Sequence, residues 1–351
     1  MIRASFHFSF LVVLLTLLAG CQDQPPPGPK VEQQEIFTTL ITLSLYNNPD
    51  EAVYTSIFDR LHLIDGWMSD YRSDSEISHV TAQAGIAPVK VSPETLHVVK
   101  QALVQSALTN GIFDPSIGPV THLWNVGSDT AHVPTPAAIA AAKALVNWKD
   151  VVIDDQAGTI FLKRRGMQLD VGGIAKGFAM DQALTIARKA RVTTGIFNMG
   201  NSSIGLLGTK PGGKAWKIGV QDPFQASGAY FATVDGSEMT VETSGPYQKF
   251  FMAGGKRYHH IMDPRTGSPA ASGLEQVTLI LPLDTKLADG LSTSCFILGL
   301  DRGLALVESL PDAAAVFVTS DRRVVVSSRV GSKFNLIDKT FTLVPSPRRS
   351  S

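Results

Sequence analysis

The spacing of apolar residues changes along the chain, from a helical period near the start to short strand-like runs later. Ile57, Leu61, Ile64 and Met68 recur every three or four residues, which predicts an amphipathic helix over residues 52–68. Such a stripe is typical of a helix face that packs into a core, so it implies no ligand.

Capping residues predict two further helices. Ser92 precedes Pro93, the arrangement of an N-cap followed by proline in the first turn, and Gly111 lies at the stop signal of that helix. A cap-and-proline pair also opens an Ala-rich stretch, which predicts a helix over residues 135–146.

Short apolar runs bounded by Gly and Pro predict strands. These runs are residues 38–46, 151–153, 159–162, 216–220, 230–234 and 276–281, and helices are expected over residues 174–190 and 285–298. Helices followed mostly by strands predict the α+β class, with mixed or antiparallel sheets and packed helices. Because no repeat or internal linker is evident, we expect one folded body of two lobes over residues 31–345.

The first thirty residues have the pattern of an export signal. Arg3 precedes an apolar run over residues 6–18, which is shorter than the roughly 20 residues that a membrane-spanning helix needs. Leu-Ala-Gly then precedes Cys21 and resembles a bacterial lipobox. We therefore expect a signal peptide over residues 1–20, lipidation of Cys21 and a Pro-rich tether over residues 21–30. An uncleaved anchor is the alternative.

Charge and composition exclude several classes of protein. The 31 Lys and Arg residues balance 31 Asp and Glu residues, so no basic surplus is available to neutralise a nucleic-acid backbone. Apolar residues make up 44% of the chain and charged residues 18%, which excludes extensive disorder. Two cysteines cannot form a disulfide scaffold, and Cys295 has no partner once Cys21 is lipidated.

Two glycine-rich segments have different interpretations. Residues 169–171 are expected to form a strand before Gly172, and the following helix start with Lys176 is suited to an anion such as pyrophosphate. Residues 208–215 nearly match a phosphate-binding P-loop, but Ala215 stands where a hydroxyl is needed and a strand follows. A hairpin turn is therefore expected there.

Two other segments carry metal or acid–base chemistry. A proline-stiffened loop brings together His260, Asp263 and Arg265, although a surface turn would have the same composition. Asp289 and Thr293 are four residues apart on a predicted helix, so a carboxylate and a hydroxyl can reach one hard cation. An ordinary polar helix face is the alternative.

Together with Phe113-Asp114-Pro115, these segments resemble the ApbE-type FAD:protein FMN transferases, also called flavin-trafficking lipoproteins. The matching blocks lie within residues 61–77, 111–124, 170–177, 198–201, 219–223, 243–245, 258–264 and 288–289. The resemblance implies an enzyme that binds FAD, cleaves its pyrophosphate, transfers FMN to a Ser or Thr hydroxyl of an exported acceptor and releases AMP. It also implies acceptors among the subunits of membrane redox complexes, such as a sodium-pumping NADH:quinone reductase, and a location on a cell-envelope membrane facing the periplasm.

The resemblance also implies roles for individual residues. It assigns Mg²⁺ to the carbonyl oxygen of Ala175 and the side chains of Asp289 and Thr293, which are oxygen donors suited to this ion. Contacts with FAD fall on Tyr71, Phe113, Asp114, Gly172, Phe178 and Asp181. His260 is the candidate general base and also a contact of the substrate, because an imidazole titrates near neutral pH. From its charge alone, Arg265 is a candidate phosphate ligand.

Three alternatives remain, and one departure from the family stands out. An FAD pyrophosphatase would use the same residues with water as nucleophile, and a flavin-binding lipoprotein would use them without turnover. A solute-binding lipoprotein would share only the lipobox and would leave the metal pair unexplained. The family's Met-Gly-Thr block on the first strand is not matched here, where residues 35–39 read Glu-Ile-Phe-Thr-Thr.

Overall fold

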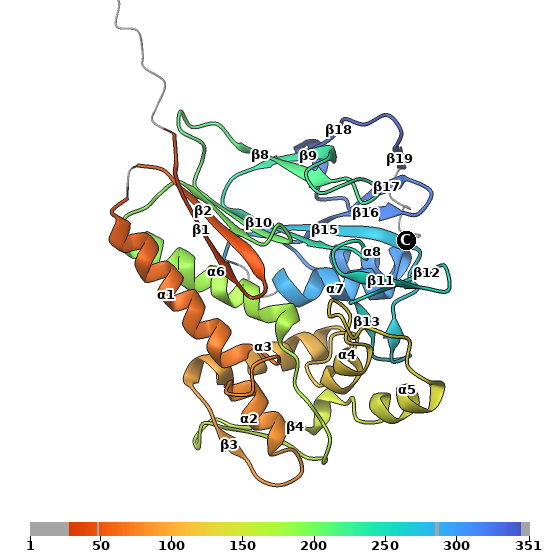
Figure 1. The fold of residues 1–351 in the computed structure, drawn as a ribbon. Helices are drawn as coiled ribbons and strands as arrows, with labels where there is room; N and C mark the ends of the chain where they lie inside the picture. The colour runs from red at the N-terminus through yellow and green to blue at the C-terminus, as the bar shows by residue number, and fades with distance from the viewer. Residues whose placement is uncertain (1–27, 48, 285–287, 345–351) are drawn as a thin grey trace, which may run out of the picture.

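A nine-stranded sheet forms the middle layer of the protein in a computed structural model, which describes residues 28–47, 49–284 and 288–344 (Figure 1). Its strands lie in the order β1 (Lys30–Ile36), β2 (Thr39–Leu45), β6 (Gly195–Met199), β7 (Ser203–Leu207), β10 (Met239–Ser244), β15 (Leu274–Pro282), β16 (Ala314–Thr319), β17 (Arg323–Val326) and β19 (Thr342–Val344). Neighbouring strands are antiparallel except β17 and β19, which are parallel. The sheet is therefore mixed.

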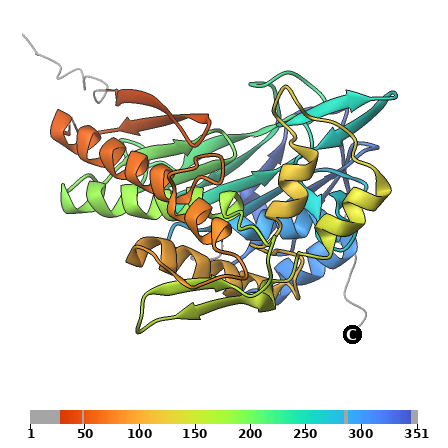
Figure 2. The same ribbon diagram turned by 60° about the horizontal axis from the view of Figure 1, so that its bottom comes forward.

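Helices cover one face of this sheet and a small sheet covers the other (Figures 1 and 2). The helices nearest the sheet are α1 (Glu51–Met68), α6 (Gly172–Lys189), α7 (Ala288–Leu298) and α8 (Leu300–Ser309), with α2 (Glu76–Ala82) and α3 (Pro93–Leu108) beyond them. The covering sheet has the order β18 (Phe334–Leu336), β9 (Tyr230–Gly236) and β8 (Trp216–Gln221).

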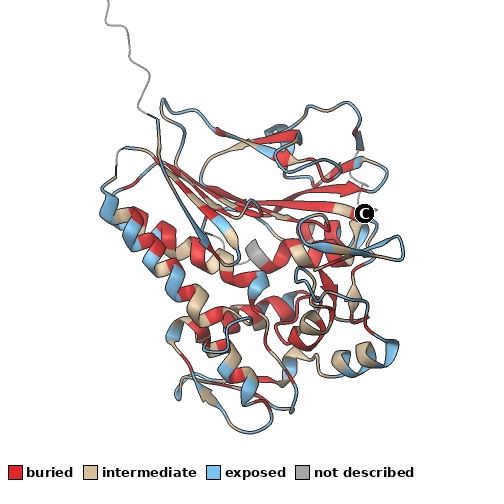
Figure 3. Cartoon of the chain, in the orientation of Figure 1, coloured by how far each residue is buried: buried red, intermediate tan, exposed pale blue. Residues whose placement is uncertain are grey.

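Strand β16 shows why both faces of the large sheet are covered. All six of its residues are buried (Figure 3). Ala315 and Phe317 belong to the core beneath α7 and α8, whereas Val316 and Val318 belong to the core beneath the small sheet. Side chains alternate between the two faces of a strand, so an uninterrupted apolar run is stable only where each face has a covering layer.

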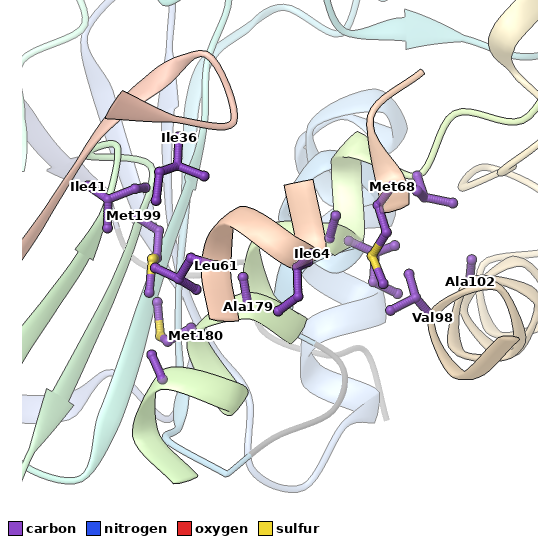
Figure 4. Packing of buried hydrophobic residues seen from close by; sticks show 14 of the residues in the cluster. Ile36, Ile41, Leu61, Ile64, Met68, Val98, Ala102, Ala179, Met180 and Met199 are labelled. Carbon is purple, nitrogen blue, oxygen red and sulfur yellow. The ribbon is translucent and has the colours of Figure 1, made fainter. Parts of the chain in front are cut away.

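The core of the other half joins α1 and α6 to the sheet. Leu61 and Ile64 of α1 lie with Ala179 and Met180 of α6 against Met199 of β6 (Figure 4). The apolar stripe over residues 52–68 is therefore buried, as its spacing predicts.

Smaller elements lie around the helical face. A three-stranded sheet has the order β3 (Val89–Lys90), β5 (Thr159–Leu162) and β4 (Val151–Asp154), and α4 (Gly118–Trp124) and α5 (Pro136–Lys143) lie near two hairpins. These hairpins are β11 (Phe250–Ala253) with β12 (Lys256–His259), and β13 (Met262–Asp263) with β14 (Ser268–Pro269). Within the described residues, none of the helices has the length and apolar character needed to cross a membrane.

The predicted α+β class is confirmed, and three local predictions are wrong. Residues 169–171 form no strand, because the amide of Leu169 donates to the hydroxyl of Thr81 on α2 and that of Asp170 donates to the carbonyl of Pro115. These partners replace a strand ladder. Residues 208–215 contain a tight turn, in which the amide of Gly213 donates to the carbonyl of Lys210 at 2.9 Å. The flanking strands β7 and β8 lie in different sheets, so the segment is not the turn of a hairpin. Helix α5 ends at Lys143, short of residue 146.

Candidate active site

A cavity of about 730 Å³ lies where the large sheet, α6, α7 and several loops meet. Its wall comes from segments far apart in the chain: the β1–β2 turn, the loops after α1 and α3, the first turn of α6, the end of β10 and the base of the β11–β12 hairpin. Hydroxyls, carboxylates and two lysines line it together with apolar side chains.

The structure brings seven of the predicted site residues to this cavity. They are Tyr71, Phe113, Asp114, Gly172, Ala175, His260 and Thr293. Helix α7 carries Asp289, whose side chain lies outside the described residues. The predicted signal peptide and Cys21 also lie outside them.

Three predicted contacts lie away from the described cavity wall. The ring of Phe178 lies 5.7 Å from the ring of His97 on α3, and the carbonyl of Asp181 accepts a hydrogen bond from Thr185 within α6. The guanidinium of Arg265 donates to both carboxylate oxygens of Asp263, at 2.7–3.2 Å. In this geometry, a phosphate would compete with Asp263 for Arg265.

His260 is held in the tautomer that a general base requires. Its Nδ1 lies 3.2 Å from the carbonyl oxygen of Lys249, which can only accept, so Nδ1 carries the proton and Nε2 keeps its lone pair. Burial, reinforced by the charges of Lys249 and Lys176, lowers the pKa of His260 to about 4. The imidazole is therefore neutral at pH 7 and able to take up a proton.

Two lysines give the same part of the cavity a positive character. Lys249 donates to Thr38 at 3.2 Å, and Lys176 donates to Ser202. Burial and the neighbouring charge of Lys176 lower the pKa of Lys249. An anion would offset the repulsion between these ammonium groups, so the geometry favours a ligand that carries phosphate.

Oxygen donors from two helices line the same cavity as the lysines. Ala175 lies in the first turn of α6, and Thr293 on α7 has its hydroxyl 3.3 Å from that of Ser244, which in turn lies 2.9 Å from Ser292. This donor set fits a hard divalent cation that shares its shell with phosphate oxygens. Among the described residues, no three His, Cys, Asp or Glu side chains form a group that could hold a metal by themselves.

Phe113 sets the distance between those two helices. A Cβ atom on Gly173 of α6 would lie 3.1 Å from its ring, and one on Gly290 of α7 would lie 2.7 Å from it. The ring thus fills the space that two side chains would need. Asp114 beside it accepts hydrogen bonds from Ser116 and from the amide of Trp148, so its carboxylate organises the loop.

The same cavity contains an acidic cluster, whose carboxylates Asp70 and Asp170 act on the charge of Lys249. Asp70 lies 2.9 Å from Nε2 of His122, whose Nδ1 lies 2.7 Å from Gln168. The hydrogen bond to Asp70 raises the pKa of His122, while burial and the charge of Asp70 raise the pKa of Asp170 to about 6. Tyr71, whose exposed fraction is 69%, presents its ring next to this cluster. An aromatic face beside hydrogen-bonding groups suits a heteroaromatic ligand.

The β1–β2 turn also lines the cavity, through Phe37, Thr38 and Thr39. Phe37 and Thr38 both have positive φ, 55° and 56°, although neither is glycine. The next residue, Thr39, packs closely against Gly200. A Cβ atom added to Gly200 would lie 2.3 Å from the hydroxyl oxygen of Thr39. Neither the turn nor this close approach has a signal in the local sequence.

Comparison with known proteins identifies a transferase enzyme and gives its family. The ApbE family profile matches residues 37–317, so this chain belongs to the ApbE family. An FAD:protein FMN transferase of Treponema pallidum is 31% identical over 96% of this chain and 98% of its own length. One from Klebsiella pneumoniae is 32% identical over 87% of this chain and 93% of its own length.

Solved structures agree with this assignment. The ApbE protein of Thermotoga maritima superposes with a TM-score of 0.79 at 29% identity, covering 86% of this chain and 97% of its own. A structure described as the flavin transferase ApbE of Vibrio cholerae gives a TM-score of 0.77 at 26% identity and covers 87% and 99% of the two chains.

Proposed function

We propose that this chain is an Mg²⁺-dependent FAD:protein FMN transferase, which attaches FMN to a Ser or Thr hydroxyl of an exported protein and releases AMP. The observation that carries the proposal is the neutral imidazole of His260, whose Nε2 lone pair is available in a cavity that also contains Lys176 and Lys249. A base beside an anion-binding wall is the arrangement needed to activate a hydroxyl toward a phosphate.

The lysines would bind the pyrophosphate of FAD. Lys176 and Lys249 approach from α6 and from the base of the β11–β12 hairpin, on separate segments. Together they can neutralise the charge that develops on the phosphate oxygens as the nucleophile attacks. The bound anion would also raise the pKa of His260, making it a stronger base in the complex than in the free protein.

His260 would take the proton of the acceptor hydroxyl. The hydroxyl oxygen forms a bond to the FMN-side phosphorus, the bond from this phosphorus to the bridging oxygen breaks, and AMP leaves with that oxygen and its electron pair. The proton remains on Nε2 and can then pass to a phosphate oxygen of AMP or to water. The Lys249 carbonyl keeps Nδ1 protonated throughout, which fixes the ring orientation.

The Ala175 carbonyl and the side chains of Asp289 and Thr293 would hold Mg²⁺. When bound, the ion would act as a Lewis acid toward the pyrophosphate. In the same cavity, the ring of Tyr71 would cover a ring of FAD, and the carboxylates of Asp70 and Asp170 would accept hydrogen bonds from FAD. Phe178, Asp181 and Arg265 remain predicted contacts.

The proposed partners and location rest on the sequence. A signal peptide over residues 1–20 and lipidation of Cys21 would hold the enzyme on a cell-envelope membrane, facing the periplasm. Exported subunits of membrane redox complexes, such as a sodium-pumping NADH:quinone reductase, would then be within reach as acceptors.

The test uses the full chain in detergent with FAD, Mg²⁺ and a purified candidate acceptor. Mass spectrometry should show the acceptor gaining one FMN while AMP appears, and both products should be lost in His260→Ala and Asp289→Ala. AMP without acceptor labelling would instead indicate an FAD pyrophosphatase. Tightly bound FAD without AMP would indicate a flavin carrier.

A further inference from the structure

We propose that the β11–β12 hairpin is the docking surface for the acceptor polypeptide, which would bind there as an extended segment carrying apolar and acidic residues next to the modified hydroxyl. This inference rests on the proposed function and names the part of the molecule that would select the second substrate.

The two faces of the hairpin have different surroundings. On one face, the rings of Phe251 and Tyr258 stack at 5.4 Å, and Tyr258 stacks in turn on Trp124 of α4 at 5.4 Å. This face is anchored in the small core that includes Val120 and Met262. The anchoring holds the hairpin in a defined position relative to the cavity.

The other face leaves large apolar side chains in solvent. Phe250 and Met252 are 43% and 59% exposed. Arg257, which lies opposite Met252 in the register, has its guanidinium 5.0 Å from the ring centre of Phe250. This combination of an aromatic ring, a methionine and an arginine is typical of protein-binding surfaces.

The backbone of the hairpin is also available for pairing. Strands β11 and β12 pair only with each other among the described strands, so each has an outer edge without a neighbouring strand. An extended peptide can add to such an edge through main-chain hydrogen bonds. No acidic residue occurs between positions 249 and 260, and Arg257 there is paired with Glu275 at 3.4 Å. Lys256 is therefore the charge of the hairpin that an acidic segment would meet.

The base of the hairpin connects this surface to the active site. Lys249 and His260 lie at the ends of the two strands, where the His260 amide donates to the Lys249 carbonyl at 3.1 Å, and both line the cavity. With a rise of about 3.3 Å per residue, Met252 lies about 10 Å along the strand from Lys249. Lys249 and Met252 are three residues apart, so the two side chains lie on opposite faces of the hairpin. A segment whose hydroxyl reaches His260 would therefore place its third neighbour, which also points to the opposite face, against Met252.

A lipid surface fits this position less well than a protein does. A bilayer seated on Phe250 and Met252 would cover the hairpin whose base, at Lys249 and His260, lines the cavity that the acceptor must reach. The same exposed residues next to the base favour the acceptor as occupant.

The first test measures binding and transfer separately. The probe is a peptide of about 15 residues centred on the modified Thr of the acceptor subunit of a sodium-pumping NADH:quinone reductase. The variant Phe250→Ser/Met252→Ser should weaken peptide binding, measured by fluorescence anisotropy, and raise the KM for the acceptor at least tenfold, with FAD affinity unchanged. The control Ile337→Ser/Leu343→Ser replaces two residues that are equally exposed, 53% and 48%, and lie outside the cavity wall.

The outcomes separate the docking surface from the proposed function. Hairpin-dependent peptide binding without any FMN transfer would uphold the docking surface and reject the transferase. Failure of the peptide to bind the unaltered chain, or equal binding by the hairpin variant, would overturn the docking surface. Lys256→Glu/Arg257→Glu should also weaken binding, and a peptide with its acidic residues changed to Lys should restore it.

A fluorophore on Met252→Cys tests the membrane alternative. Cys295 is buried and should not compete for labelling. In proteoliposomes, the peptide should shift the emission of the fluorophore to shorter wavelength. Quenching by brominated lipids instead would show that the hairpin enters the bilayer and would overturn the proposal.

Discussion

Nδ1 of His260 lies 3.2 Å from the carbonyl oxygen of Lys249, and this contact orients the imidazole through the backbone of its own hairpin. Lys249 lines the cavity as well, so the residue that accepts this hydrogen bond also brings an ammonium group to the cavity. The proposed base and the proposed anion ligand therefore lie on one hairpin, and a displacement of this hairpin would affect both.

Replacing His260 should separate chemistry from binding. His260→Ala should lower the rate of FMN transfer by about 10²–10⁴, the usual contribution of a general base, with FAD affinity changed little. Quenching of flavin fluorescence measures the affinity, and mass spectrometry of the acceptor measures the rate. The neighbouring His259 is buried and hydrogen-bonded to the Ala270 carbonyl, so His259→Ala should instead lower the free energy of unfolding. If His260→Ala transferred FMN as fast as the unaltered chain, His260 would not be the general base.

Thr293 should control the response to Mg²⁺. Thr293→Val removes the hydroxyl but keeps the shape, so the Mg²⁺ concentration needed for half-maximal transfer should rise about tenfold or more. The same variant should lose the Mg²⁺-dependent rise in melting temperature measured with FAD present, whereas Thr293→Ser should keep it. Thr185→Val on the exposed side of α6 is the matched control. Equal Mg²⁺ responses in all three variants would exclude the hydroxyl as a ligand.

Gly290 should be intolerant of alanine because of Phe113. Helix propensity alone favours alanine by about 1 kcal/mol, but its Cβ would lie 2.7 Å from the Phe113 ring, and overpacking costs about 1–3 kcal/mol. We expect Gly290→Ala to lower the free energy of unfolding in urea.

Two further variants identify the cause. Gly66→Ala in α1, where nothing lies within 4 Å of the added atom, should raise the free energy of unfolding. Adding Phe113→Leu to Gly290→Ala should recover part of the loss, measured as a double-mutant cycle. If the two substitutions changed the free energy of unfolding additively, the Phe113 ring would not be the cause of the destabilisation in Gly290→Ala.

Tyr71 should contribute to FAD affinity through its ring. Its exposed fraction of 69% falls when a planar ligand covers it, so Tyr71→Ala should weaken FAD binding about tenfold. Tyr71→Phe keeps the ring and should bind FAD nearly as well as the unaltered chain. Equal weakening in both variants would assign the effect to the hydroxyl.

Asp170 should reduce stability at neutral pH. Because burial and Asp70 raise its pKa to about 6, from 3.8, the folded chain binds the proton more tightly than the unfolded chain. Stability is therefore lost as pH rises from about 4 to 6. Asp170→Asn should raise the free energy of unfolding by about 1–2 kcal/mol at pH 7.5, and the gain should shrink toward pH 4.

The control for this effect is Asp155→Asn, which removes an exposed ion pair with Lys100 and should change stability by less than about 1 kcal/mol. A gain in Asp170→Asn that is the same at pH 4.5 and 7.5 would contradict the raised pKa. Urea unfolding at several pH values provides the comparison.

The sequence predicts elements whose determinants are local. Ser92 and Pro93 place the start of α3 because a cap acts on its own first turn, and the apolar stripe predicts α1 because its period is that of the helix. Residues 169–171 are the opposite case. The hydrogen-bond partners of Leu169 and Asp170 are Thr81 and Pro115, which are far away in the chain, so the residues around 169–171 do not determine their conformation.

The same distinction applies to the site. Seven residues that the family motifs single out line the cavity. Asp70 and His122 also lie in matching blocks, but they are 52 positions apart, so their contact could not be predicted from either block. The sequence also does not predict Lys249 as a site residue, because a lysine next to aromatic residues in a hairpin forms no recognisable motif. Such residues become recognisable only when the fold brings their neighbours together.

The position of the Phe113 ring between Gly173 and Gly290 also bears on how these enzymes can change. The ring is at once a wall of the substrate cavity and the spacer between the helices that carry the proposed cation ligands. A smaller residue at position 113 would leave a void unless one of the glycines gained a side chain. Positions 113, 173 and 290 should therefore covary among homologues, and a designer who alters flavin selectivity at Phe113 would be altering metal affinity at the same time.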